Sequence, residues 1–490
     1  MTMRLRILLA AAFTLLPAAA SGQGRDCELV RASQARRIET TYSELWFVSG
    51  PAEFRCTDGT AVRADSAIYN EGVSLELIGR VFYADSARTL EAERAVYYLT
   101  SQRLHAQGSV VLTDRRDDGS VIRGESLTHE RATPDRPEAR TIVSGQPRPH
   151  ATFRPRGSAE AAPGDTATLP FEVDADWMEI RGESRFTATG NVEISRGATR
   201  SGARGATFDQ AEERLVLTAD AWIEQEDLRL QAQTIEVALA GEQLRSVIAR
   251  EQAHLEGRDL TVDATTIRLE FEDGALQRLI AVVPPPAPEA VGTEPPVARP
   301  RAIAHARDLR LIADSIDALA PGQTLREIIA VGDAFAAREP DSLSVGLPEL
   351  IANDWVSGDT IDAHFALAEK AVSSSDPPRA GAEQTRPGSA VGAGRDTAEV
   401  VLERLIVTGP GGRAQALYRV SREGRDPGPP AINYTVADRI TLVLSGGEVK
   451  EAEATGEVRG NYLEPQRRSA RSAPGDGSAP GQRPPTTESR

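Results

Sequence analysis

Apolar and polar side chains alternate residue by residue in two well separated stretches of the chain. The apolar and small side chains of residues 103–113 are Leu104, Ala106, Gly108, Val110 and Leu112. Those of residues 185–195 are Phe186, Ala188, Gly190, Val192 and Ile194. Because successive side chains of a strand point to opposite faces, this period of two predicts half-buried β-strands. Both strands carry a glycine at the same place in the pattern.

The glycine-centred strand recurs along the chain, and a second kind of strand precedes it. Further copies are centred on Gly50, Gly79, Gly332, Gly409 and Gly456, and weaker copies, at 217–223 and 247–255, replace the glycine. The second kind carries a small residue followed by an acid, at Asp65, Glu93, Glu125, Asp176, Asp314 and Asp438. A repeat of roughly 30 residues is typical of stacked arrays. We therefore expect an all-β fold, an elongated β-jellyroll or solenoid-like groove built from repeated two-strand units of about 30 residues.

The repeats and the segments between them divide the chain into regions. Basic Arg4 and Arg6 precede an apolar run that ends in small residues, which predicts a signal peptide at 1–20 and an exported mature chain without a lipid anchor. Segments rich in Pro, Gly, Ala and Ser are expected to be loops. The predicted regions are a first β-repeat region at 38–145, a second at 170–283, divergent β-repeats at 301–462 and a disordered tail at 463–490.

The side chains expected to face inward are mostly alanine, valine, leucine and isoleucine, and aromatic residues make up only 5% of the chain. Two interpretations follow from this composition. Small side chains leave space between two facing sheets, and an under-filled apolar trough suits acyl chains. Alternatively, glycine and alanine only permit tight corners in a packed solenoid. The pattern alone does not decide between them.

Charge and cysteine content limit the classes of binding partner and the cellular compartment that we expect for the chain. The net charge is −16 and only two lysines occur, which argues against nucleic-acid binding. No stretch after the leader reaches the ~18–20 apolar residues that a transmembrane helix needs. The chain has two cysteines, Cys27 and Cys56, which in an oxidising compartment are expected to form one disulfide. A redox or metal role is the lesser alternative, because no CxxC spacing exists.

The repeated strands resemble those of the OstA-like periplasmic bridge family of lipopolysaccharide transport. The similarity is clearest in residues 61–113 and 173–194, and degenerate copies continue to about residue 460. The resemblance implies a periplasmic β-jellyroll with an apolar lumen for lipid A acyl chains, joined to other β-jellyroll transport proteins by edge-strand pairing. Carried over by position, the lining of the lipid groove would be Leu75, Leu77, Val81, Leu104, Ala106, Val110, Leu112, Phe186, Val192 and Ile194.

No catalytic or cofactor motif accompanies the repeats. The six histidines show no metal-binding spacing, and neither a nucleophile elbow nor a phosphate-binding loop is present. The acids recur at one position of every unit, as in a solvent-facing ladder, whereas a catalytic pair would be unique. We therefore expect no enzyme, cofactor or metal. A structural or adhesive β-solenoid is the main alternative, followed by a parallel β-helix that acts on polysaccharide.

Overall fold

The computed structural model is an all-β protein: among the residues that it describes, the only helix is the short 3-10 turn η4 (Pro321–Gln323). It divides into two compact units, unit 1 up to Glu251 and unit 2 from Gln252. The structure describes residues 27–464 except 42, 116–118, 154–168, 183, 241–242, 258–259, 285–299, 307–308, 339–352, 368–399 and 421–429. The predicted signal peptide, and the tail after residue 464, lie outside the described residues.

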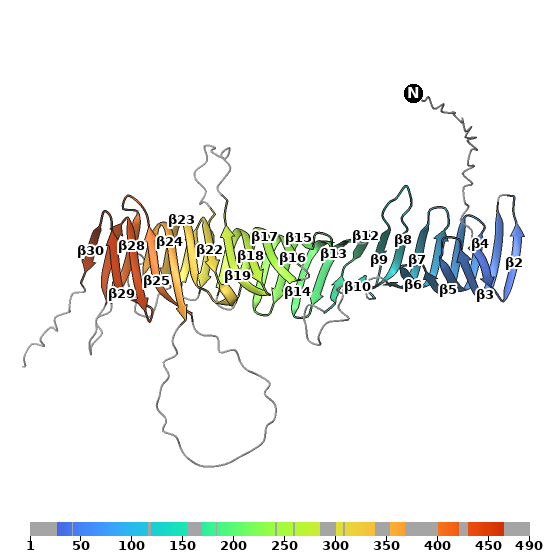
Figure 1. Ribbon diagram of the computed structural model, residues 1–490, viewed down its shortest axis with the longest axis horizontal. Coiled ribbons are helices and arrows are strands. Elements are labelled where there is room, and N and C mark those ends of the chain that lie inside the picture. The colour runs from blue at the N-terminus through green and yellow to red at the C-terminus, as the bar shows by residue number, and fades with distance from the viewer. Residues whose placement is uncertain are drawn as a thin grey trace, which may run out of the picture. The chain divides into compact units, whose positions relative to one another are not determined.

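Unit 1 is a succession of antiparallel strands, most of which pair with their neighbours in the chain (Figure 1). It contains β1 (Cys27–Arg31), β2 (Gln34–Glu39), β3 (Glu44–Cys56), β4 (Ala61–Asn70), β5 (Ser74–Ala84), β6 (Arg88–Tyr98), β7 (Arg103–Asp114), β8 (Val121–Glu130), β9 (Arg140–Ser144), β10 (His150–Phe153), β11 (Phe171–Asp174), β12 (Trp177–Arg181), β13 (Arg185–Arg196), β14 (Thr199–Asp209), β15 (Arg214–Gln225), β16 (Leu228–Ala240) and the first part of β17 (Gln243–Glu256). The boundary between the units falls within β17.

Each long strand bends near its middle and thereby contributes to two half-sheets. In the β5–β6 pair, residues 74–78 pair with 94–98, the register then shifts, and residues 81–84 pair with 89–92. We call the first set of segments half-sheet A and the second half-sheet B. The same division runs through β3, β4, β7, β8 and β13 to β16. The bend holds one side of the two half-sheets together, and the turns lie at their other ends.

The glycine of the repeat lies at the bend, and the repeated acid packs against it. Gly79 and Arg80 both have positive φ, 77° and 46°, the left-handed region that glycine favours. A Cβ on Gly79 would lie 2.6 Å from Oδ2 of Asp65, whose carboxylate also accepts a hydrogen bond from Arg80 Nη2 at 2.6 Å. Equivalent contacts in the two units are Glu93 on Gly108, Glu125 on Gly145, Asp176 on Gly190, Asp314 on Gly332 and Asp438 on Gly456. The repeated acids are therefore part of the bend.

Two strands that correspond to the glycine-centred copies, β15 and β17, bend without a glycine. In β15 the positive φ values are those of Ala219 and Asp220, and in β17 those of Glu251 and Gln252. The left-handed conformation costs an ordinary residue about 1–2 kcal/mol. The pairing of the half-sheets on either side therefore imposes the bend even where the local sequence opposes it.

Replacing the bend glycine of β13 is expected to destabilise unit 1 more than replacing a turn glycine. Gly190→Ala meets both a positive φ of 79° and Asp176 Oδ2 at 2.5 Å from the new Cβ. Gly72→Ala meets a φ of 71° but no atom within 4 Å. The backbone accounts for about 1–2 kcal/mol in both variants, and crowding adds roughly 1–3 kcal/mol at Gly190 alone. Equal losses in urea denaturation would show that Asp176 does not confine this glycine.

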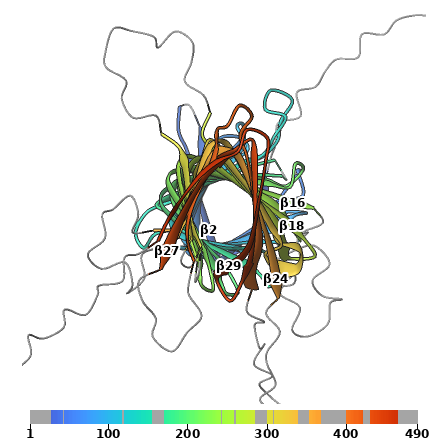
Figure 2. The ribbon, with the colours of Figure 1, turned by 90° about the vertical axis from the view of Figure 1, so that its left-hand side faces the viewer.

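Unit 2 repeats the same arrangement. Beyond the end of β17 it contains β18 (Leu260–Glu272), β19 (Ala275–Val282), β20 (Ala302–Ala306), β21 (Leu309–Ala313), β22 (Ser315–Leu319), β23 (Glu327–Arg338), β24 (Trp355–Leu367), β25 (Val400–Thr408), β26 (Ala414–Val420), β27 (Ala431–Ala437), β28 (Arg439–Ser445), β29 (Glu448–Thr455) and β30 (Arg459–Leu463). Asp273 and Gly274, both with positive φ, form the tight turn between β18 and β19. In Figure 2 the nearest strands of this unit, such as β27 and β29, are seen along their length.

The all-β fold built from repeated two-strand units is confirmed. Strands begin at Cys27, before the start of the first predicted region at residue 38, and the predicted disulfide between Cys27 and Cys56 joins β1 to β3. The ladders for which a register is determined are all antiparallel, as in the neighbouring pairs of β3 to β8. This pattern excludes a parallel β-helix for the described strands.

Candidate functional site

The ten residues predicted to line a groove lie on the inward-facing side of unit 1. Half-sheet A contributes Leu75, Leu77, Leu104, Ala106 and Phe186, and half-sheet B contributes Val81, Val110, Leu112, Val192 and Ile194. Nine of them are buried, with at most 8% of their surface exposed, and Ile194 is half-buried. The strand repeat therefore brings these side chains into one apolar interior. In the structure, protein atoms cover the nine buried side chains almost completely.

Aromatic rings from opposite half-sheets meet inside unit 1. Phe54 of half-sheet B lies 5.8 Å from Tyr69 of half-sheet A, measured between ring centroids. Tyr83 of half-sheet B and Tyr97 of half-sheet A are 6.1 Å apart. A third such pair, Phe153 and Phe186, is separated by 4.9 Å. These contacts, together with the low exposure of the lining, show an interior that is packed shut over β3 to β13.

The sequence contained a signal for these rings. Tyr69 and Tyr83 have the inward parity of their strands, close to the ends that adjoin turns. The low overall aromatic content suggested spare room between the sheets, but six aromatic residues of unit 1 pair where the two half-sheets converge. A count over the whole chain does not show that placement.

Opposite the bends, the turns that end half-sheet A meet those that end half-sheet B. We call this line of contact the seam. Asp58, in the turn after β3, accepts a hydrogen bond from Tyr97 Oη at 2.7 Å and another from Arg131 Nη1 at 2.8 Å. Arg131 Nη1 also donates to Thr60 Oγ1 at 2.9 Å. Asp58 and Thr60 lie at the end of half-sheet B, whereas Tyr97 and Arg131 lie at the end of half-sheet A.

Burial strengthens the polar contacts among Asp58, Thr60, Tyr97 and Arg131. We call this cluster the clasp. Burial alone would raise the pKa of Asp58, but hydrogen bonds from Tyr97 and Thr60 and the charge of Arg131 outweigh it and lower that pKa. Burial and the bond to Asp58 raise the pKa of Tyr97 to about 12, so this hydroxyl remains a donor. Only 13% of the Asp58 side chain and 23% of the Arg131 side chain are exposed.

A second buried link crosses the seam farther along unit 1. Arg88, on half-sheet B, pairs with Asp114 through Nε at 3.1 Å, and its Nη1 lies 3.4 Å from both His129 Nδ1 and Thr141 Oγ1 of half-sheet A. His129 Nδ1 and Thr141 Oγ1 are 2.9 Å apart. Burial and then the charge of Arg88 lower the pKa of His129 to about 3, so the ring is neutral near pH 7.

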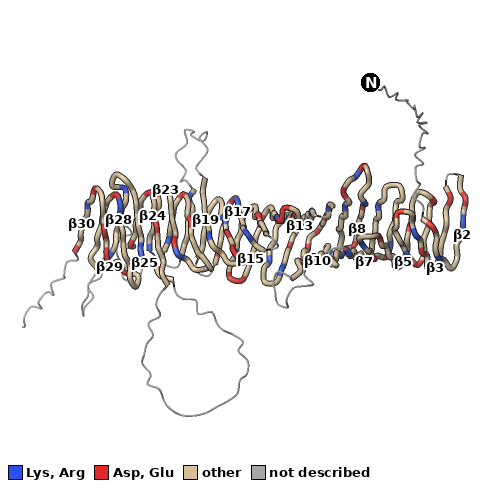
Figure 3. The backbone as a smooth tube through the Cα atoms, viewed as in Figure 1, with Lys and Arg blue, Asp and Glu red and all other residues tan. Residues whose placement is uncertain are grey.

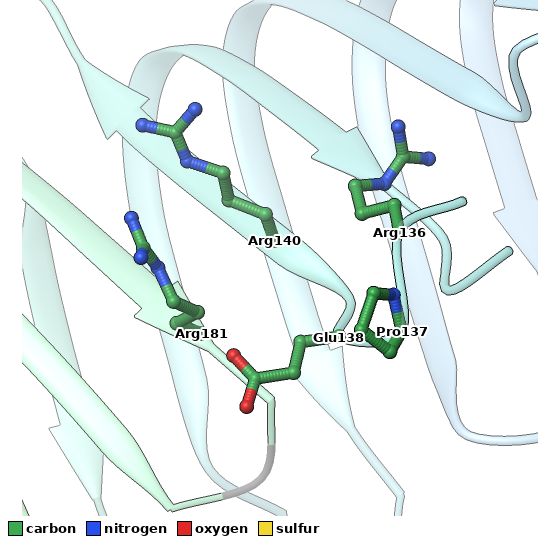
Figure 4. Close-up of a pocket in the computed structure, with 5 residues that line it drawn as sticks. All are labelled: Arg136, Pro137, Glu138, Arg140 and Arg181. Carbon is green, nitrogen blue, oxygen red and sulfur yellow. The ribbon is translucent and has the colours of Figure 1, made fainter. Parts of the chain in front are cut away.

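A shallow cavity of about 210 Å³ lies beside the loop between β8 and β9. Figure 4 shows its lining: Arg136, Pro137, Glu138, Arg140 and Arg181. Arg140 and Arg181 are cross-strand neighbours that both donate to Glu179, at distances of 3.0 and 2.7 Å. Arg136 donates to the carbonyl oxygens of Arg131 and Ser101. The three guanidinium groups are thus engaged within the protein, and Arg136 fixes the backbone that carries the Arg131 side chain.

One group in unit 2 has the side chains of a metal site. Glu327, Asp362 and His364, on the adjacent strands β23 and β24, place one ligand atom each within 4.8 Å of one another. His364 Nε2 is 3.2 Å from Asp362 Oδ2, and its Nδ1 is 3.9 Å from Glu327 Oε1. Because each ring nitrogen already faces a carboxylate, one on its own strand and one on the adjacent strand, polar contacts within the group account for the arrangement.

Charge is distributed along the outer surfaces of both units. Figure 3 shows acidic and basic positions interspersed over the strands and turns of each unit. Within the described residues, no helix is long and apolar enough to cross a membrane.

Comparison with solved structures gives a partial likeness. The crystal structure of LptH, the LptA-homologous periplasmic component of the lipopolysaccharide transport device of Pseudomonas aeruginosa, is similar to part of this chain at 20% sequence identity. The match covers 28% of this chain and 96% of that one, with a TM-score of 0.22. No protein-family model and no curated protein matches the chain. The function therefore has to be argued from the interior and the seam.

Proposed function

We propose that this protein is a periplasmic, non-enzymatic carrier that shields the acyl chains of a lipopolysaccharide-like glycolipid in the apolar interior of its bent β-sheets. The observation that carries the proposal is the interior of unit 1. Strand after strand, both half-sheets turn apolar side chains inward, including Leu75 and Leu77 on one and Val81 and Val110 on the other. Acyl chains are long and uniformly apolar, so a repeating apolar interior matches them along their length.

Opening at the seam would give acyl chains access to this interior. The half-sheets are joined covalently at the bends, whereas opposite the bends they are held by ring contacts and by the hydrogen bonds of Asp58 and Arg88. Separation at the seam would replace contacts between the half-sheets by contacts with acyl chains. The packed interior is thus the unloaded state of the proposed carrier.

Edge strands offer a way to join such carriers to one another. β2 at one edge is exposed throughout and carries Arg36 and Arg37. β29, an edge strand of unit 2, carries exposed Glu448, Glu451 and Glu453. Exposed edges pair readily with strands of other chains, and opposite charges favour that encounter. We therefore propose other β-jellyroll proteins as partners, by edge-strand pairing.

Photo-crosslinking tests the location of the lipid. A photoreactive amino acid at Leu77, Val110 or Val192 is expected to crosslink to glycolipid in protein recovered from the periplasm, because these side chains face the interior. Matched positions at Glu76 and Gln107 lie on the same strands with the opposite parity. Mass spectrometry of the adducts measures the result. Adducts of equal yield at both sets of positions, or none at the first three, would contradict an internal lipid site.

The packed interior also favours a second candidate, a structural or adhesive β-solenoid. Leu75, Leu77 and Ala106 have none of their surface exposed, as in the core of a scaffold. A scaffold needs no lipid, so protein purified from the periplasm would contain none and its seam would stay shut. Co-purified glycolipid, identified by mass spectrometry, separates the carrier from the scaffold.

A further inference from the structure

We propose that the seam of unit 1 is the gate of the lipid site and that the clasp of Asp58, Thr60, Tyr97 and Arg131 is its lock. Acyl chains would enter unit 1 sideways, between the two rows of turns, when the clasp parts. This inference rests on the proposed carrier function and specifies where and how the interior is reached.

The position of the clasp supports a gate. Its three hydrogen bonds, of 2.7 to 2.9 Å, all run from the end of half-sheet A to the turn between β3 and β4 at the end of half-sheet B. Continuous backbone crosses from one half-sheet to the other at the bends, so the bend side cannot part without breaking strands. The seam is therefore the side on which these half-sheets can separate while every strand ladder stays intact.

The chemistry of the clasp supports the same conclusion. If the seam were held by apolar side chains, those side chains would be exposed to water as soon as it opened. Asp58 and Arg131 instead regain hydration when they separate, which offsets much of the electrostatic attraction that is lost. A buried ion pair adds little net stability compared with packed apolar side chains, but it holds one defined geometry. A charged clasp thus closes the interior specifically while keeping the free energy of opening moderate.

The rings beneath the clasp complete the gate. Tyr97 takes part in both the clasp and the ring contacts, since its hydroxyl bonds to Asp58 while its ring lies against Tyr83. Withdrawal of Tyr97 from Asp58 therefore loosens the aromatic contact that closes the interior directly below. Leu75 and Leu104, the cross-strand neighbours of Tyr97, are among the predicted lining residues. The gate opens next to the proposed site.

Two tyrosines provide a matched pair of variants. Tyr97→Phe removes a hydrogen bond that crosses the seam, whereas Tyr434→Phe removes one of 3.0 Å to Gln415 in unit 2, outside the gate. We would measure the uptake of cis-parinaric acid, a fatty acid that fluoresces in apolar surroundings, by the full mature chain in stopped flow. Tyr97→Phe is expected to take up the probe about five-fold faster, the factor for one hydrogen bond of ~1 kcal/mol. Tyr434→Phe is expected to match the wild type.

A covalent lock supplies the converse test. The two cysteines of the chain form the Cys27–Cys56 disulfide, so Asp58→Cys with Arg131→Cys adds a single reactive pair. Joining this pair with bis-maleimidoethane is expected to abolish uptake, while the same variant capped with N-ethylmaleimide takes up the probe at least as fast as wild type. Circular dichroism and thermal melting would verify that each form is folded.

The outcomes separate the gate from the carrier. Uptake by the locked protein at the wild-type rate, or equal rates for Tyr97→Phe and Tyr434→Phe, would overturn the gate and leave the carrier function standing. Failure of every form to take up the probe, including the capped and unlocked variant, would overturn both the gate and the proposed function.

Discussion

Asp58→Ala is expected to lower the free energy of unfolding of unit 1 by about 3–5 kcal/mol, the usual effect of removing one partner from a buried ion pair. The loss is large because Asp58 accepts bonds from both Tyr97 and Arg131, and the truncation leaves Arg131 without its carboxylate. Neither side chain of the pair is more than 23% exposed, so water replaces the lost contacts poorly. Urea denaturation followed by circular dichroism measures the change.

The matched control is an exposed pair in the same unit. Arg31 and Glu53 are 3.8 Å apart, and their side chains are 67% and 33% exposed. Glu53→Ala is expected to change the stability by less than about 1 kcal/mol. In the double variant Asp58→Ala with Arg131→Ala, the second change should add much less than it does alone, because the charge it removes is already unpaired. A loss for Asp58→Ala no greater than that for Glu53→Ala would show that the clasp does not hold the seam.

Acidification from pH 7.5 to pH 5 is expected to lower the stability of unit 1 by about 2 kcal/mol through His129 alone. The sign follows from the lowered pKa. In the folded state burial and the charges of Arg88, Arg131 and Arg136 lower the pKa of His129 to about 3, and the attraction of Asp85 does not compensate. In the unfolded chain the pKa is about 6.5. Below pH 6.5 the unfolded state therefore binds a proton that the folded state does not, and the stability falls by ~1.4 kcal/mol per pH unit until about pH 3.

His129→Gln removes this titration. Although the variant loses stability at neutral pH, its stability is expected to depend on pH between 7.5 and 5 by about 2 kcal/mol less than that of the wild type. Urea midpoints taken at a series of pH values give both curves. Parallel curves for the two proteins would mean that His129 carries its proton in the folded state and that the seam is wetter than the structure shows.

The strands and their inward faces were predictable because they rest on local chemistry. A period of two assigns each side chain of β5, β7 and β13 to a face, and nine of the ten residues that the family resemblance places in the lumen are buried. The position of the bend was also visible, as the glycine of the repeat. The role of the repeated acid on the preceding strand was not predictable, since the contact of Asp176 with Gly190 joins neighbouring strands and depends on the shape of the bend. The positive φ of Ala219 shows that a bend can form even where the local sequence does not favour it.

By itself, the sequence determined that this is an all-β chain of bent, repeated strand pairs with one apolar face, because side-chain alternation and a repeated glycine act within a few residues. Only the tertiary structure decided how that face is closed. Asp58 and Arg131 are 73 residues apart and belong to no repeat, and Tyr83 meets Tyr97 only because two half-sheets converge. Contacts of this kind depend on the angle between the half-sheets, which sums small twists over many strands and leaves no periodic trace in the sequence.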